Sequence, residues 1–272
     1  MRNGWAWTDQ LCVVGEISKQ WKNPWWQVHR VDVHRELKRV LFGCCGEETA
    51  NAPELILGAI VEDIDVNAGK VTLSDGRTFT SDVIIGADGN ASFCRLQIDP
   101  DARLQRWEKV CFRFLVPKQV LLDDPETRDL VKEDSWFSEI SEADRRVIFY
   151  SCRNNTIVNV GAFVPNAEAN ATGHGKYLIA AFWSIVLVLI LRLDIDWNQP
   201  GEKVTMLKAF ENWYPAARKL LSYAPDDLRV WQLFDMPTLE HWSKGRLAVI
   251  GDAAHPFLPC KSQLSSTARS LG

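Results

Sequence analysis

A glycine and an aspartate follow a short apolar run near the end of the chain. Residues 247–250 are all apolar, which predicts a buried strand, and Gly251 and Asp252 come directly after them. Small residues then begin a predicted helix. A carboxylate beside the N–H groups of a helix N-terminus suits a ligand with hydroxyl groups and electron-rich oxygens. The alternative is structural, with Asp252 capping the helix.

The same arrangement occurs earlier in the chain. Residues 83–87 form an apolar run without alternation, as in a parallel sheet covered on both faces, and Asp88 and Gly89 follow it. Ligands of open α/β sheets bind outside the carboxyl ends of the strands, and a glycine there lets a phosphate approach the backbone closely. Here too the alternative is a cap, with Asp88 at the start of the next helix.

Periodicity predicts the elements around these two motifs. Residues 33–42 have one apolar face at helical spacing, and residues 202–223 read as a helix that Pro215 breaks or kinks. Asp75-Gly76 predicts a hairpin turn. Strands are predicted at residues 55–61, 71–73, 78–80, 110–116, 146–150 and 156–164.

Composition narrows the class of protein. The 272 residues are 46% apolar and 24% charged with a net charge of −4, which is ordinary for a globular protein and gives no basis for nucleic-acid binding. The seven cysteines are odd in number and form no CxxC pair, so we expect no disulfide framework and no metal site. With no signal-peptide pattern at the N-terminus, these features predict a cytoplasmic protein.

One apolar segment fits no predicted element. Residues 177–191 contain no charge, but they fall short of the roughly 18–20 apolar residues that a spanning helix needs. We therefore expect a buried helix, a buried strand or an insertion near residues 172–194, and not a membrane protein. A membrane tether is the alternative.

Together the two motifs carry a family resemblance. GRLAVIGDAAHPFLP (245–259) and DVIIGADGNASFCR (82–95) resemble the Gly-Asp and Asp-Gly motifs of FAD-dependent aromatic hydroxylases, the salicylate-hydroxylase-like flavoprotein monooxygenases. Residues 28–37 resemble the arginine-containing segment of that family. The resemblance implies FAD contacts from Arg30, Asp88, Gly89, Gly251 and Asp252, with Asp252 on a ribityl hydroxyl; Arg35 is the weaker choice for the arginine. His255 is either a site residue or a residue of the helix start.

The resemblance also implies a fold and a reaction. The expected fold is mixed α/β: a Rossmann-like FAD-binding domain (residues 1–103 and 202–272) with an inserted β-sheet substrate domain (residues 104–201). The implied enzyme uses FAD, NAD(P)H and O2 to hydroxylate a small aromatic substrate, and the cofactor carries the difficult chemistry.

Three departures from the family pattern qualify this expectation. No Gly-x-Gly-x-x-Gly segment is present, residues 260–266 lack the family's glycine-rich turn, and the apolar run at 177–191 has no counterpart. We therefore expect a chain truncated at both ends that binds FAD weakly or not at all alone. The alternative function is a non-catalytic remnant, a binding or dimerising module without flavin. The sequence leaves the oligomeric state open.

Overall fold

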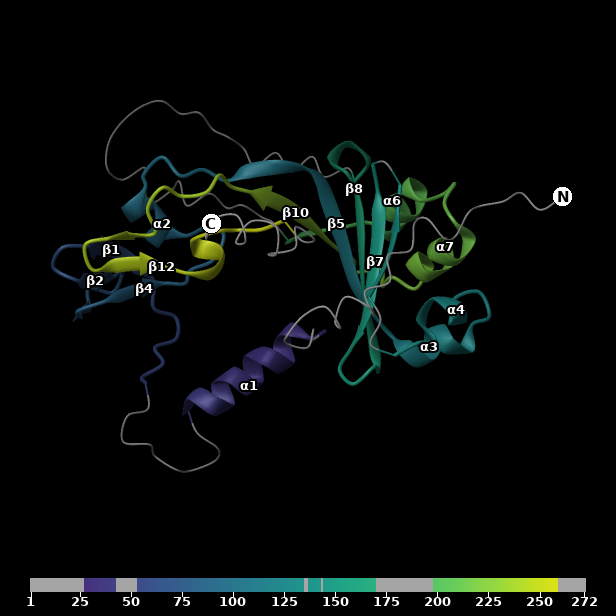
Figure 1. The fold of residues 1–272 in the computed structure, drawn as a ribbon, viewed down its shortest axis with the longest axis horizontal. Coiled ribbons are helices and arrows are strands. Elements are labelled where there is room, and N and C mark those ends of the chain that lie inside the picture. The colour runs from purple at the N-terminus through teal and green to yellow at the C-terminus, as the bar shows by residue number, and fades with distance from the viewer. Residues whose placement is uncertain (1–26, 43–52, 135–136, 143, 170–197, 259–272) are drawn as a thin grey trace, which may run out of the picture. The chain divides into compact units, whose positions relative to one another are not determined.

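The computed structural model describes residues 27–42, 53–134, 137–142, 144–169 and 198–258. The chain divides into two compact units, each of which is described by itself (Figure 1). The first unit takes residues 1–53, 108–173 and 197–232, and the second takes the remainder. Helices and strands are both present, which confirms the mixed fold class.

A six-stranded sheet is the frame of the first unit. Its strand order is β6-β7-β8-β5-β10-β9, and the pairs β6–β7, β7–β8, β8–β5 and β10–β9 are antiparallel. The strands are β5 (Gln105–Pro117), β6 (Phe137–Ser141), β7 (Arg146–Cys152), β8 (Ile157–Pro165), β9 (Asn198–Pro200) and β10 (Arg229–Asp235). The chain passes between the two units along β5 and β10.

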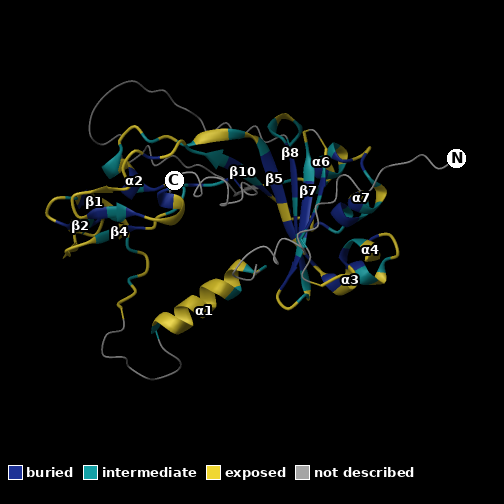
Figure 2. Ribbon diagram, viewed as in Figure 1, coloured by how far each residue is buried: buried dark blue, intermediate teal, exposed yellow. Residues whose placement is uncertain are grey.

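Helices cover one face of this sheet and bury a large apolar core. Successive strand residues point to opposite faces, so every second residue, such as Phe112 or Val160, is fully buried against helix residues such as Met206 and Leu220. Figure 1 shows these helices on one side of the sheet, and the buried residues are dark blue in Figure 2. The helices are α3 (Lys118–Asp123), α4 (Arg128–Val131), α6 (Lys203–Ala209) and α7 (Pro215–Ser222), with the short η2 (Asn166–Ala169).

Helix α1 (Arg30–Phe42) also belongs to the first unit and has no buried residue. It is attached through an ion pair: the Arg153 guanidinium donates hydrogen bonds of 2.8 and 2.7 Å to the Asp32 carboxylate. Arg153 lies in the turn between β7 and β8, where it and the next two residues have φ values of 53° to 60°. The tight turn between β7 and β8 therefore positions Arg153, the ion-pair partner of α1.

Two small sheets make up the second unit. β1 (Val61–Asp65), β2 (Lys70–Leu73) and β3 (Thr78–Thr80) form an antiparallel meander. The other sheet has the order β11-β12-β4, where β12 and β4 run parallel. Its elements are β4 (Ile84–Gly86), β11 (Ser243–Lys244) and β12 (Leu247–Val249), flanked by α2 (Phe93–Ile98) and η3 (Gly251–Ala253).

Some predicted elements are corrected. The strand predicted at 55–61 is wrong: β1 begins only at Val61, and Leu55 and Leu57 are 50% and 76% exposed. Sequence periodicity also missed β6 and β10. The break predicted at Pro215 within residues 202–223 is confirmed: α6 ends before it, and Pro215 occupies the first turn of α7, where its missing N–H has no cost.

The expected domain boundaries also differ from the observed units. Residues 202–232 pack with the sheet of the first unit and not with the two motifs, because α6 and α7 bury the core face of that sheet. Residues 30–42 are also in the first unit. Among the described helices none is long and apolar enough to cross a membrane, and the run at 177–191 lies outside the described residues.

Candidate functional site

Parallel strand pairing brings the two predicted motifs together. β12 pairs with β4 in register from Leu247 opposite Ile84 to Val249 opposite Gly86, and the Ile250 N–H donates to the Gly86 carbonyl at 2.9 Å. The carboxyl ends of both strands therefore lie at the same edge of the sheet. The Asp88 loop and the Asp252 loop leave that edge side by side.

Close packing of α2 against β4 sets the shape of the first loop. A Cβ atom at Gly86 would lie 2.5 Å from Cys94 Cβ and 3.1 Å from Val249 Cγ1, so only glycine allows this approach. Burial, with a smaller contribution from the nearby Asp88 charge, raises the pKa of the Cys94 thiol to about 12. Cys94 is thus a neutral packing residue.

The Asp88 carboxylate is exposed and accepts three hydrogen bonds within the chain. One oxygen accepts a hydrogen bond from Ser92 Oγ at 2.6 Å, and the other accepts from the backbone N–H groups of Phe93 and Cys94 at 2.8 and 3.0 Å. Ser92 Oγ in turn accepts from the Arg95 N–H at 2.8 Å. The N-cap of α2 is therefore Ser92 and not Asp88, which instead bonds to the Ser92 hydroxyl and to the first two N–H groups of the helix.

Asp252 follows β12 as Asp88 follows β4, but the surroundings of its carboxylate differ from those of Asp88. It is exposed, and none of the described residues forms a hydrogen bond or ion pair with its carboxylate. Gly251 and Gly89 have φ values of +59° and +76°, and at both positions the space around a Cβ is empty to 4 Å. The two loops thus offer open backbone and one carboxylate without a partner among the described residues.

A buried arginine joins the two loops. Arg95, only 3% exposed, donates to the backbone carbonyls of Asp252 at 3.3 Å and Ala253 at 3.0 Å in one loop, and of Asn90 in the other. Its Nε has no hydrogen-bond partner among the described residues. Burial lowers the pKa of the guanidinium, and the nearby Asp88 charge opposes that shift. Arg95 therefore fixes the separation of the loops.

Comparisons with known proteins agree with this geometry. A sequence model of the family described as "FAD binding domain" matches residues 57–267. The chain is 32% identical to hispidin-3-hydroxylase of Neonothopanus nambi, over 91% of this chain and 56% of that protein. A solved salicylate hydroxylase–substrate complex superimposes with a TM-score of 0.62 and 26% identity, over 85% of this chain and 52% of the other.

The chain belongs to the FAD-binding-domain family. It is also 24% identical to salicylate hydroxylase of Pseudomonas putida, over 92% of this chain and 58% of that protein. The chain spans about half the length of the curated relatives it matches.

His255 and Arg30, the other residues predicted for the site, have surroundings that differ from those of the two loops. The His255 ring packs against Trp242 and Phe257, with centroids 5.4 and 4.7 Å apart, and its Nδ1 is buried without a partner among the described residues. Arg30 is the first residue of α1 and lies in the first unit, whereas the loops lie in the second. The structure groups Asp88, Gly89, Gly251, Asp252 and His255 in one unit.

Sequence reasoning missed Arg95. The available signal was a single charged residue in the short, otherwise mostly apolar helix that follows the Asp-Gly motif. Such a residue on the buried side of a helix needs partners, and here it finds them in backbone carbonyls.

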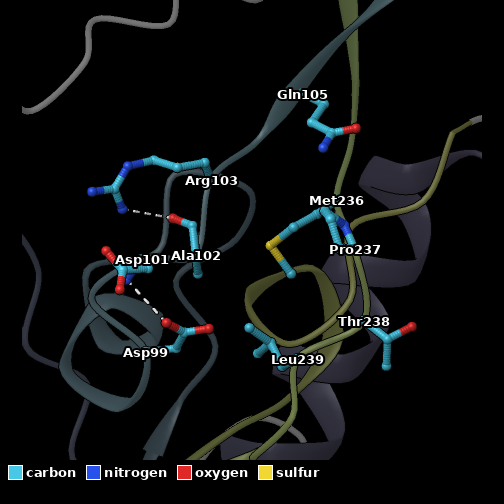
Figure 3. A pocket seen from close by; sticks show the side chains of 9 residues that line it. All are labelled: Asp99, Asp101, Ala102, Arg103, Gln105, Met236, Pro237, Thr238 and Leu239. Atoms are coloured by element: carbon cyan, nitrogen blue, oxygen red, sulfur yellow. Dashed lines mark hydrogen bonds between the residues drawn. The ribbon is translucent and has the colours of Figure 1, made fainter.

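A shallow cavity of about 220 Å³ also lies in this unit, away from the predicted residues. Figure 3 shows Met236 and Leu239 facing the segment that contains Asp99 and Ala102. The Asp101 N–H donates to the Asp99 carboxylate, and the Arg103 guanidinium donates to the Ala102 carbonyl. These polar groups thus have partners within the chain. No group of three potential metal ligands occurs among the described residues.

The loops fit a flavin nucleotide. A ribityl chain carries hydroxyl donors, which match the unpartnered Asp252 carboxylate, and the phosphates need close access to backbone N–H groups, which Gly251 and Gly89 leave open. Asp88 is exposed and its carboxylate can accept a further hydrogen bond beyond the three it already accepts, so its contact with FAD stays a prediction.

Proposed function

We propose that this chain is part of an FAD-dependent monooxygenase that hydroxylates a small aromatic substrate with NAD(P)H and O2. The observation that carries the proposal is the parallel pairing of β4 and β12, with Arg95 bonded to both loops. Relatives with the printed names "3-amino-4-hydroxybenzoate 2-monooxygenase" and "Salicylate hydroxylase" support an aromatic substrate.

The residues of this chain would bind and orient the cofactor. We assign Asp252 to a ribityl hydroxyl and Gly251 and Gly89 to close backbone approach, while Arg95 acts indirectly by fixing the loops. Asp88 and Arg30 remain proposed FAD contacts on the family resemblance. When bound, FAD would supply the redox chemistry and the activation of oxygen, with NAD(P)H as the source of electrons.

Flavin titration tests the proposal. FAD is added to the full chain, and binding is followed by the change in flavin fluorescence. Because the chain lacks the Gly-x-Gly-x-x-Gly segment, we expect weak binding that still saturates and that Asp252→Ala weakens about tenfold, the loss of one charged hydrogen bond. Asp226→Ala, which removes another exposed aspartate, is the matched control. Equal affinity of Asp252→Ala and the wild type would remove Asp252 from the site.

The alternative is a binding or dimerising module without flavin. Absence of saturable FAD binding by the wild-type chain would support this module over the monooxygenase.

We also propose a cytoplasmic location. The basis is the unpaired cysteine pattern of the sequence and the three described cysteines, Cys94, Cys111 and Cys152, which are all free thiols.

A further inference from the structure

A cavity of about 360 Å³ lies in the first unit, on the side of α7 that faces away from the core. Four of its lining residues are separated by three, four and seven positions, which puts them on one face of the helix: Pro215, Arg218, Lys219 and Ser222. The residues that α7 buries, such as Leu220, lie on the opposite face. The lining residues of α7 therefore do not belong to the core of the unit.

The apolar part of the cavity wall is mostly aliphatic and elongated. It is formed by Leu207 and Phe210, from the end of α6, and by Pro215. Phe210 is only 1% exposed and packs edge-on against the Trp213 ring, so it presents no ring face for stacking. The lining residues of α7 extend over about 10 Å, and the volume lies within the range of about 300–1,000 Å³ for small-molecule sites. A slender alkyl chain suits this wall better than a flat ring.

Two charged residues that line the cavity are already paired. Lys219 Nζ lies 3.5 Å from the carboxylate of Glu126, the other charged lining residue, and 3.3 Å from that of Asp124. Hydrogen bonding to Asp124 raises the pKa of Lys219, so this ammonium group stays charged within its ion pairs. Lys219 and Glu126 are therefore held by partners within the chain.

Arg218 differs from these two residues, because its charge has no counterpart. Its side chain is exposed, and none of the described residues hydrogen-bonds or ion-pairs with its guanidinium. A guanidinium has five N–H donors in a planar fork that matches the two oxygens of a carboxylate. The cavity therefore combines an aliphatic wall with one cation whose donors are open to a ligand.

We propose that this cavity binds an aliphatic carboxylate, with its alkyl chain along α7 and its carboxylate on Arg218. The alkyl chain and the apolar wall would leave water together, and the carboxylate would pair with the one unpartnered cation of the cavity. A neutral ligand of the same shape would gain only the first of these two terms. The proposal goes beyond the proposed function, because it names a second ligand and a site that shares no residue with the two loops.

Paired probes of the same chain length test the charge preference. Isothermal titration calorimetry measures the binding of octanoate, below the concentration at which it forms micelles, and of neutral octanamide to the full chain. The wild type binds octanoate more tightly; Arg218→Gln raises the octanoate dissociation constant about tenfold and changes that of octanamide less than about twofold. Arg229→Gln is the matched control, because Arg229 is an exposed arginine of β10 outside the cavity, and it leaves both constants unchanged.

Two substitutions at one lining position test the cavity itself. Ser222 is half-buried, so Ser222→Phe fills the space beside it and weakens the binding of both probes. Ser222→Ala removes only the hydroxyl and leaves both dissociation constants unchanged, while the far-UV circular dichroism of both variants stays that of the wild type. Equal weakening of both probes by Arg218→Gln, unchanged octanoate binding in Ser222→Phe, or a wild type that binds neither probe or prefers octanamide would overturn the proposal.

The outcome is separable from that of the flavin titration. All residues that line the cavity belong to the first unit, and the two loops belong to the second. A failed FAD titration with intact discrimination between octanoate and octanamide therefore rejects the proposed cofactor site alone, and the reverse result rejects the carboxylate site alone.

Discussion

Two loops of the second unit look alike in sequence and differ in structure. Each places an aspartate just after a short apolar strand, and the strands are neighbours. The Asp88 carboxylate accepts two hydrogen bonds from the first N–H groups of α2 and one from Ser92 Oγ, whereas none of the described residues bonds to the carboxylate of Asp252. The Asp88 carboxylate therefore has a structural role, whereas that of Asp252 has none among the described residues.

The difference originates in the element that follows each strand. α2 is a helix whose first N–H groups need an acceptor, and Asp88 supplies it. η3 is a single turn in which the N–H groups of Ala254 and His255 already donate to the Gly251 carbonyl at 2.9 and 3.0 Å. η3 has no side-chain cap, and none of the described residues bonds to the Asp252 carboxylate.

The largest expected effect is the loss of the arginine that joins the loops. Arg95→Met leaves three carbonyls of both loops without their donor, and we expect the free energy of opening of β4 and β12 to fall by about 3 kcal/mol. Amide hydrogen exchange of residues 84–86 and 247–249 measures it.

Arg103→Met is the control for that variant. Arg103 also donates to backbone carbonyls, those of Pro100 and Ala102, but it is exposed, so its loss should change stability by less than about 0.5 kcal/mol. Equal effects of the two variants would show that the loops do not depend on a buried link.

A methyl group at the base of the Asp88 loop should have the next largest effect. Gly86→Ala places its Cβ 2.5 Å from Cys94 Cβ, which must move α2 and should cost about 2 kcal/mol by overpacking. Gly161→Ala is the matched control, since its Cβ meets only contacts of 3.4 Å or more. Thermal unfolding of the two variants measures the difference, and equal melting temperatures would contradict the close packing of α2 on β4.

Exchanging each aspartate for alanine tests the comparison directly. Asp88→Ala removes the acceptor of the first N–H groups of α2 and should lower stability by about 1 to 2 kcal/mol, whereas Asp252→Ala should change it by less than about 0.5 kcal/mol. Hydrogen exchange of the α2 amides is the measurement. A stability loss in Asp252→Ala as large as that in Asp88→Ala would mean that both carboxylates are structural.

The sequence predicted the positions of these loops but not the use of their carboxylates. Apolar runs without alternation and the glycines after them predicted the positions of β4 and β12 correctly, but burial of β4 on both faces is wrong, because Ile85 is 53% exposed. Whether the Asp88 carboxylate bonds to α2 or binds a ligand depends on the length and direction of that helix. Packing of α2 against Gly86 sets both, and the motif does not encode this packing.

Other errors have the same origin. Leu55 and Leu57 alternate as in a strand, but no partner strand pairs with them, so they remain exposed. β10 was missed because strand pairing with β5 and β9, and not periodicity, defines it. The sequence predicts residues 215–222 (α7) in the same domain as the two motifs, because sequence order does not reveal which sheet face a helix covers.

The smallest expected effect concerns a third aspartate, Asp32, whose partner is a charge. Hydrogen bonding to the Arg153 guanidinium lowers the pKa of Asp32 below its ordinary value of 3.8. A lowered pKa in the folded state means that the ion pair stabilises α1 fully above the unfolded-state pKa of about 3.9 and progressively less as the pH falls through the folded value. Both side chains are partly exposed, so the effect is small.

Arg153→Gln should therefore lower the protection of α1 amides at pH 7, and its difference from the wild type should shrink toward pH 2 as Asp32 takes up a proton. Hydrogen exchange at the two pH values, corrected for intrinsic rates, measures the change. A difference that persists at pH 2 would assign the role of Arg153 to packing of its stem and not to its charge. Asp32 would then resemble Asp252, an aspartate whose carboxylate the fold does not use, more than Asp88.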